Sequence, residues 1–209
     1  MSTAIVGLIG VILGSILAGL KDWLVHVFKR RSDGRYAAVM TIAVLEEYLQ
    51  KCVAVVADDG TCEGRPAGRT DQGEEYLAPQ AKKPEPPIYP ADVDWRSISF
   101  KLMYKILSLP NAARETDRYI AASAEHSFPP DYDEFFAARQ EGYAHLGLQA
   151  FGLIEGLREE FRLPATNSKF WDWGWSAEKF FQEKLDELQK HRRNDVIADK
   201  KVAADSGRE

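Results

Sequence analysis

An N-terminal run of apolar residues constrains this chain more than any other feature. Residues 4–20 read AIVGLIGVILGSILAGL, in which Ser15 is the only polar side chain and no side chain is charged. Counted from Thr3, the run has 18 residues, which corresponds to about 27 Å of α-helix. The hydrocarbon core of a bilayer is roughly 30 Å thick. The run therefore predicts a single transmembrane helix over residues 3–20.

The residues that follow this run predict its orientation. Trp23 and the basic residues Lys29, Arg30 and Arg31 are typical of a membrane interface, and no basic side chain precedes the run. The positive-inside rule then places the N-terminus outside and the rest of the chain in the cytoplasm, as in a single-pass protein of the inner (cytoplasmic) membrane. Residues 1–31 would form this anchor. A cleaved signal peptide and a buried core helix are the alternative interpretations.

Small residues recur along the predicted anchor. Gly10, Gly14 and Ala18 are spaced by four and share one helix face, and Gly7 precedes them. Small residues allow two membrane helices to approach closely. The spacing predicts self-association of the anchor through these four residues.

The rest of the chain has helical periodicity, interrupted by one irregular segment. Residues 32–193 are expected to form a bundle. Within it, residues 57–91 contain six of the ten prolines and four glycines, which predicts a long flexible loop. Residues 84–87 of this loop form a PxxP sequence, for which a plain linker is favoured over a peptide ligand of SH3-type domains. The first helix is expected over residues 34–56, from an apolar stripe at alternating steps of four and three: Ala38, Ile42, Leu45, Leu49, Cys52 and Val56.

Further helices are expected after the loop. One begins at Asp92 or Asp94. Pro110 is expected to bend the chain or to start a new helix, and a second stripe continues to about residue 126. Asp131 and Glu134 resemble a capping box at the start of the longest helix of the bundle, which ends near residue 162. A last helix covers residues 176–193, and the charged tail 194–209 is expected to be disordered. The predicted fold class is all-α, with one transmembrane helix followed by a soluble four- to five-helix bundle.

Four glycines lie inside the longest predicted helix of the bundle. Each of Gly142, Gly147, Gly152 and Gly156 costs about 1 kcal/mol of helix stability relative to alanine. Such costs suggest close contact with a neighbouring helix, which we expect at least at Gly152 and Gly156.

The charge distribution argues against nucleic-acid binding. The chain has a net charge of −5, but its first 31 residues hold only four basic side chains and one acidic side chain. The remaining residues therefore carry 23 basic and 31 acidic side chains, a net charge of −8. Binding to a phosphate backbone needs a basic surface, so no nucleic-acid partner is expected.

No recognisable pattern of catalytic or metal-binding residues is present. Cys52 and Cys62 form neither a CxxC sequence nor a cluster with histidine, and a disulfide between them would depend on the compartment. Glu141 and His145 are four residues apart, but a di-metal bundle needs Glu-x-x-His on two helices and further glutamates. We therefore expect no catalytic residue, no cofactor, no metal and no enzymatic activity.

An aromatic cluster is the most unusual local feature of the predicted bundle. Phe170, Trp171, Trp173 and Trp175 lie within six residues. Tryptophan tolerates both apolar and hydrated surroundings, so the cluster could grip a partner or lie on a bilayer surface. Alternatively, its rings close one end of the bundle, which is the favoured interpretation.

These features together predict a membrane-anchored helical interaction or scaffold module. It would associate with itself or bind a protein partner. One alternative is a membrane-perturbing effector whose anchor oligomerises, and another is an anchored enzyme with an unmarked site.

Overall fold

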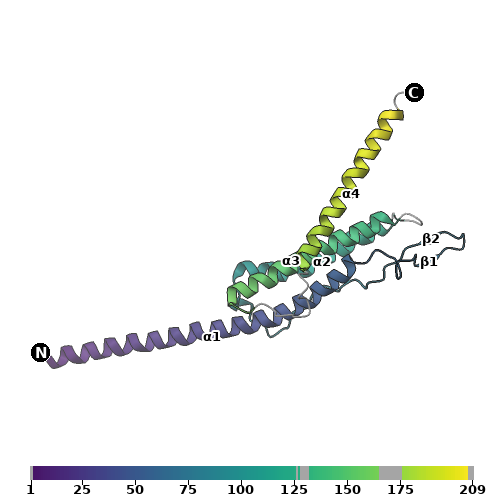
Figure 1. Ribbon diagram of the computed structural model, residues 1–209. Coiled ribbons are helices and arrows are strands. Elements are labelled where there is room, and N and C mark those ends of the chain that lie inside the picture. Colours follow the sequence, from purple (N-terminus) through teal and green to yellow (C-terminus); the bar gives the residue numbers. More distant parts are fainter. Residues whose placement is uncertain (1, 126, 128–131, 165–175, 207–209) are drawn as a thin grey trace.

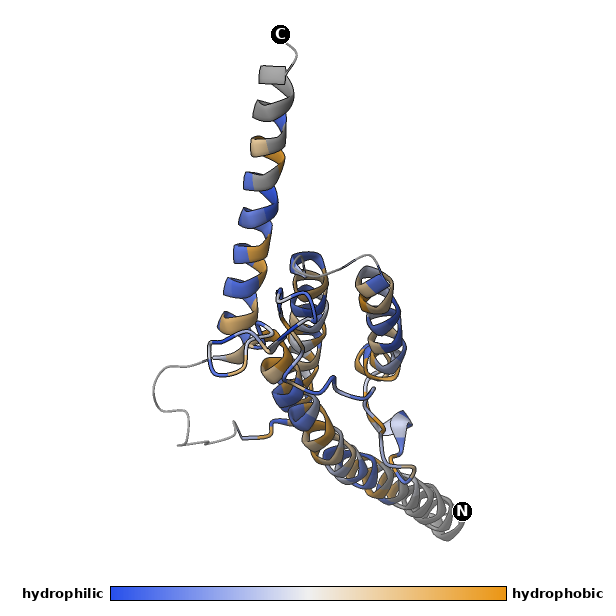
Figure 2. Ribbon diagram, turned by 90° about the vertical axis from the view of Figure 1, so that its right-hand side faces the viewer, coloured by the Kyte–Doolittle hydropathy of each residue, from blue (hydrophilic) through white to orange (hydrophobic). Residues whose placement is uncertain are grey.

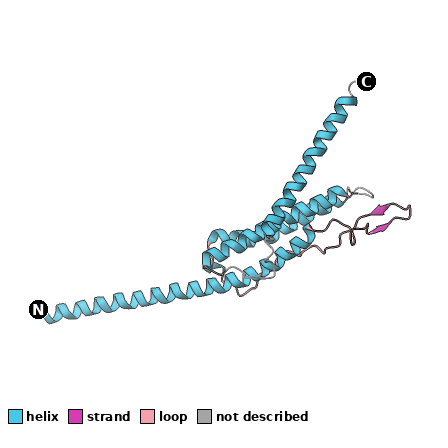
Figure 3. Cartoon of the chain, viewed as in Figure 1, coloured by secondary structure: helices cyan, strands magenta, loops and turns pink. Residues whose placement is uncertain are grey.

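The computed structural model describes residues 2–125, 127, 132–164 and 176–206. In these residues, four α-helices account for most of the chain (Figure 1): α1 (Ser2–Val56), α2 (Phe100–Glu125), α3 (Asp133–Phe161) and α4 (Ala177–Ser206). Two short strands, β1 (Gly68–Arg69) and β2 (Glu75–Tyr76), pair antiparallel, and a 3-10 turn, η1, covers Trp95–Ser97. The magenta strands in Figure 3 form a small hairpin at the edge of an otherwise helical molecule. The predicted all-α class and helical bundle are confirmed.

Helix α3 is the centre of the bundle. It packs against α1, α2 and α4, and α1 also contacts η1. Side chains from all four helices form one core, in which Leu45, Ile106, Leu157 and Phe181 are fully buried. Burying a leucine, isoleucine or phenylalanine contributes about 1.5–3 kcal/mol, so these contacts hold the helices together.

The predicted transmembrane anchor is contradicted. Among the residues that the structure describes, no helix is both long enough and apolar enough to cross a membrane. The predicted span of 18 residues lies near the lower limit of about 17 for a crossing helix. In the structure this segment is not a separate element, because it continues into Lys21, Lys29, Arg30 and Arg31 within the same helix. The single-pass topology and the inner-membrane location, with the N-terminus outside, depend on this anchor and are therefore also wrong.

Helix α1 is one helix where two were expected. Its 55 residues run without a break from Ser2 to Val56, a length of about 82 Å at 1.5 Å per residue. Residues 34–56 lie in the bundle, whereas residues 2–31, here called the arm, project away from it (Figure 1). No proline separates the two halves, and the turn-forming residues Ser32, Asp33 and Gly34 between them remain helical, with Gly34 buried in the bundle.

The irregular segment after α1 is anchored to the helices at several points. Pro84 and Pro87, the two prolines of the PxxP sequence, are buried. The Tyr89 hydroxyl donates a hydrogen bond to the carbonyl of Ile106 on α2 (3.0 Å). Lys83 forms an ion pair with Asp117, also on α2 (3.2 Å). These contacts and the hairpin were not predicted. The two prolines that define the PxxP sequence are buried, although Glu85 between them is exposed.

A buried ion pair fixes the start of this segment to α3. The carboxylate of Asp58 lies 3.4 Å from the guanidinium of Arg139, and both side chains are at most 5% exposed. The same carboxylate accepts hydrogen bonds from the backbone N–H groups of Gly60 (3.0 Å), Gln80 (2.9 Å) and Ala81 (2.9 Å). Burial lowers the pKa of Arg139 and the charge of Asp58 opposes that shift. One carboxylate therefore binds both the first turn of the segment, at Gly60, and residues 80–81, where the segment comes back to the bundle.

The glycines of α3 allow close helix contacts, at partly different positions from those expected. A Cβ atom at Gly156 would lie 2.9 Å from Leu102 of α2, as predicted, but a Cβ atom at Gly152 would meet no atom within 4 Å. The closest approach is at Gly147, where a Cβ atom would lie 2.3–2.9 Å from the ring of Phe181 on α4. Sequence spacing alone does not reveal which helix face meets a neighbour, which explains the error at Gly152.

Helix α4 is longer than predicted. It begins after Ser176, whose hydroxyl accepts a hydrogen bond from the N–H of Lys179 (3.5 Å), and it continues to Ser206 through residues expected to be disordered. In the coloured part of α4 hydrophilic residues predominate, with apolar residues between them (Figure 2). No glycine or proline interrupts residues 194–206, and five of these 13 residues are charged. Helical backbone geometry is therefore compatible with a strongly charged composition.

Several ionisable groups are buried or half-buried among α1, α2, α3 and the irregular segment. Burial raises the pKa of the Cys52 thiol from its ordinary 9.0 to about 12. Burial also raises the pKa of the phenols of Tyr48, Tyr89 and Tyr143 above their ordinary 10.0. The hydroxyl of Tyr143 additionally donates a hydrogen bond to Asp117 (2.6 Å), which raises its pKa further. All four groups are therefore protonated in the folded protein at pH values where they ionise in an unfolded chain.

We expect the protein to lose stability in alkaline solution for this reason. Between pH 9.0 and about 12 the folded chain binds more protons than the unfolded chain, so the free energy of unfolding falls as the pH rises. Urea denaturation at increasing pH measures this fall, and the phenolate absorbance should rise together with the loss of helical circular dichroism. A free energy of unfolding that stays constant over this range would contradict the burial of these groups.

Candidate functional site

A single heptad pattern runs from the arm of α1 into the bundle. In the arm it consists of Leu17, Leu20, Leu24 and Val27, at alternating steps of three and four. The pattern passes Arg31 and continues in the bundle with the same steps: Gly34, Ala38, Thr41, Leu45, Tyr48, Cys52 and Val55. Apolar residues at this spacing form the contact line between two packed helices. Helix α1 therefore carries one continuous line of helix-packing positions.

The two halves of this line have opposite environments. All the bundle positions are buried, since this half of α1 packs against α3 and η1. The arm positions are apolar but exposed, as are their neighbours Trp23 and Phe28, and these six side chains are 40–69% exposed. Within the part of the chain that the structure describes, the arm half of the line has no helix packed on it.

Six of the seven exposed large apolar residues between Leu17 and Phe28 lie on one side of the arm. At 100° per residue, an arc of about 140° holds the apolar arm face, defined as Leu17, Leu20, Trp23, Leu24, Val27 and Phe28. Val25 and Lys29 lie outside this arc, and Val25 is about 160° away from Val27. An arc at least 100° wide is typical of a helix that packs against a neighbour. The apolar arm face is thus shaped for helix packing.

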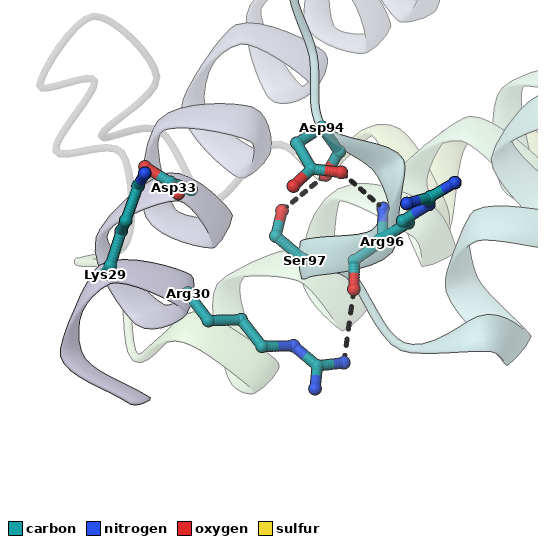
Figure 4. Close-up of a pocket in the computed structure, with 6 residues that line it drawn as sticks. All are labelled: Lys29, Arg30, Asp33, Asp94, Arg96 and Ser97. Atoms are coloured by element: carbon teal, nitrogen blue, oxygen red, sulfur yellow. Dashed lines mark hydrogen bonds between the residues drawn. The ribbon is translucent and has the colours of Figure 1, made fainter. Parts of the chain in front are cut away.

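A charged hollow lies where the arm leaves the bundle (Figure 4). It has a volume of about 440 Å³ and is lined by Lys29, Arg30 and Asp33 of α1 and by Asp94, Arg96 and Ser97 of the η1 segment. The guanidinium of Arg30 donates a hydrogen bond to the carbonyl of Arg96 (3.2 Å). Asp94 accepts a hydrogen bond from the N–H of Arg96 (3.0 Å), and its own carbonyl accepts one from Ser97 (2.5 Å).

These contacts give the hollow a structural role. Arg30 connects the root of the arm to η1, and Asp94 caps that turn. In Figure 4 the Arg30 side chain extends toward η1, whereas the side chain of Arg96 points away from Arg30. The cationic groups therefore do not converge on one point, and we assign the hollow to positioning the arm.

The residues predicted from the sequence are distributed unevenly over this region. Trp23 belongs to the apolar arm face, while Lys29, Arg30 and Arg31 form an exposed basic collar at its end. The expected association residues Gly7, Gly10, Gly14 and Ala18 belong to α1, but their side chains lie outside the described residues. Phe170, Trp171, Trp173 and Trp175 also lie outside them, so both interpretations of the aromatic cluster stay predictions.

A second exposed stripe lies on α2. Phe100, Tyr104 and Leu107 are spaced by four and three and are exposed, and the rings of Phe100 and Tyr104 stack with centroids 6.5 Å apart. The stripe was not predicted, although its spacing is visible in the sequence. It is shorter than the apolar arm face, and no contact in the structure indicates what covers it.

The residues considered for chemistry have other partners. Glu141 forms an ion pair with Arg192 of α4 (2.5 Å), and His145 is exposed. Cys52 is buried and Cys62 exposed, and both are free thiols. Among the described residues, no three His, Cys, Asp or Glu side chains gather closely enough to hold a metal ion.

Comparisons with models of protein families, with curated proteins and with solved structures give no match.

Proposed function

We propose that this protein is a non-enzymatic helical interaction module whose arm packs against a helix of a protein partner. The observation that carries the proposal is the heptad pattern of α1, which is buried over residues 34–55 and exposed over residues 17–27. In the bundle half of the same helix, residues of this pattern are buried against a second helix, α3.

The energetics of the arm support this proposal. An isolated helix in water has marginal stability even with a favourable composition. Each large apolar side chain that a partner helix covers contributes about 1.5–3 kcal/mol, and the apolar arm face has six of them. A contiguous exposed apolar face of this kind typically marks an interaction site.

The bundle supplies a rigid base for such an interaction. The root of the arm is hydrogen bonded to η1 through Arg30, and η1 is itself fixed by Asp94 and by a hydrogen bond from the N–H of Ser99 to Glu160 of α3 (2.8 Å). A fixed root presents the arm in one direction, which lowers the entropic cost of docking. The two alternative functions considered from the sequence, a membrane-perturbing effector and an enzyme, gain no supporting observation from the described residues.

Site-specific photo-crosslinking in cells tests this proposal. A photoreactive amino acid replaces Val27 on the apolar arm face, and the control replaces Val25, two residues away on another side of the arm. We expect a crosslinked protein product, identified by mass spectrometry, at position 27 and little at position 25. Equal yields at both positions, or a product with lipid in place of protein, would overturn the proposal.

A further inference from the structure

We infer that the helix covering the apolar arm face is the arm of a second copy of this chain, in antiparallel orientation. The inference rests on the proposed function and specifies the partner. Its first basis is the composition of the face. Leu17, Leu20, Leu24 and Val27 occupy alternating positions of one heptad, and all are aliphatic. In an antiparallel pair each position of one type faces a position of the other type, so this set is complementary to itself.

The basic collar disfavours a parallel pair relative to an antiparallel one. Lys29, Arg30 and Arg31 are exposed and lie at one end of the apolar arm face only. In a parallel pair, two such collars would lie side by side at a helix separation of about 8–10 Å. In an antiparallel pair centred at residue 22, the two copies of Arg30 are separated by about 24 Å along the axis. This separation exceeds the screening length of about 8 Å at physiological ionic strength.

Helix α3 gives a second argument against a parallel pair. In the bundle, the face of α1 that continues the apolar arm face is already covered by α3. A parallel copy of α1 would follow this same face and would have to leave it before residue 34, where the two bundles would then lie side by side. An antiparallel copy centred at residue 22 carries its bundle to the opposite end of the paired arms, where residues 2–10 of one copy and residues 34–42 of the other must diverge in the same way. As Figure 1 shows, the bundle of one copy lies at one end of its arm.

Sedimentation equilibrium of the full-length chain tests the partner. We expect the unmodified chain to form a dimer. Val27→Asp should raise the dissociation constant of the dimer about a hundredfold, because both copies lose a buried valine and gain a buried charge. Val25→Asp introduces the same charge outside the apolar arm face. It should change the dissociation constant of the dimer by less than about tenfold. A monomer at all concentrations, or equal effects of the two substitutions, would overturn the inference.

Spin labels test the orientation. A label is attached at position 29 through Lys29→Cys in a chain with Cys62→Ser, since Cys52 is buried. An antiparallel pair predicts a distance of about 20 Å or more between the two labels. A distance near the 8–10 Å separation of adjacent helices would overturn the antiparallel orientation.

The outcomes separate this inference from the proposed function. A monomer in sedimentation together with a crosslink from position 27 to a different protein overturns the second copy and supports the interaction module. A monomer with no protein crosslink at position 27 overturns both. A dimer that Val27→Asp weakens, with widely separated labels, supports both.

Discussion

Replacing Arg139 with methionine is expected to lower the free energy of unfolding by about 3–5 kcal/mol, because breaking a buried ion pair leaves an uncompensated charge. The Asp58 carboxylate lies 3.4 Å from Arg139, and both side chains are almost fully buried. The substitution also removes the hydrogen bond from Arg139 to the carbonyl of Ala81. Urea denaturation followed by circular dichroism measures the change.

An exposed ion pair provides the matched control. Lys51 and Glu47 lie four residues apart on α1 at 2.6 Å, and both are more than half exposed. Lys51→Met should cost at most about 0.5 kcal/mol, since exposed pairs of this kind contribute little. If Arg139→Met costs no more than Lys51→Met, the pair with Asp58 does not hold the irregular segment to α3.

The second large effect is expected from Gly147→Ala. The new Cβ atom would lie within 2.9 Å of three ring atoms of Phe181, a side chain with no exposed surface. Overpacking of a core costs about 1–3 kcal/mol, and the contact between α3 and α4 must shift to relieve it. We expect a lower free energy of unfolding in urea denaturation despite the higher helix propensity of alanine.

Gly152→Ala in the same helix should change the free energy of unfolding in the opposite direction. A Cβ atom there meets nothing within 4 Å, so the substitution should raise the free energy of unfolding by about 0.5–1 kcal/mol through backbone entropy and helix propensity. The removal of ring atoms by Phe181→Leu should reduce the cost of Gly147→Ala. Equal effects of the two glycine substitutions would show that α4 does not pack at Gly147 as described.

The helical class was accessible from the sequence because the apolar stripes are regular. Ala38, Leu45 and Cys52 share a stripe in the sequence and are all buried in the structure. The end of α3 near Arg162 was also predicted, and this residue adopts a left-handed conformation there. Local spacing determines these features, so they can be found without knowledge of tertiary contacts.

The features that were missed are of two kinds. Some depend on contacts between residues far apart in the sequence, and others were hidden because residues 3–20 were treated as a separate element. Asp58 and Arg139 are separated by 81 positions, and no local pattern joins them. The heptad line from Leu17 to Val55 is visible in the sequence, but it was divided by treating residues 3–20 as a separate membrane element. Its exposure in the arm and its burial in the bundle need the structure, because the same spacing occurs in both halves.

Amide hydrogen exchange along α1, measured as a function of protein concentration, tests most directly whether the arm is one half of a helix pair. If a second copy covers the apolar arm face, exchange at residues 17–28 should slow as the concentration rises through the dissociation constant of the dimer. Exchange at residues 38–55 should stay constant, because α3 already covers that half. Exchange rates in the arm that do not change with concentration would contradict the proposed pairing.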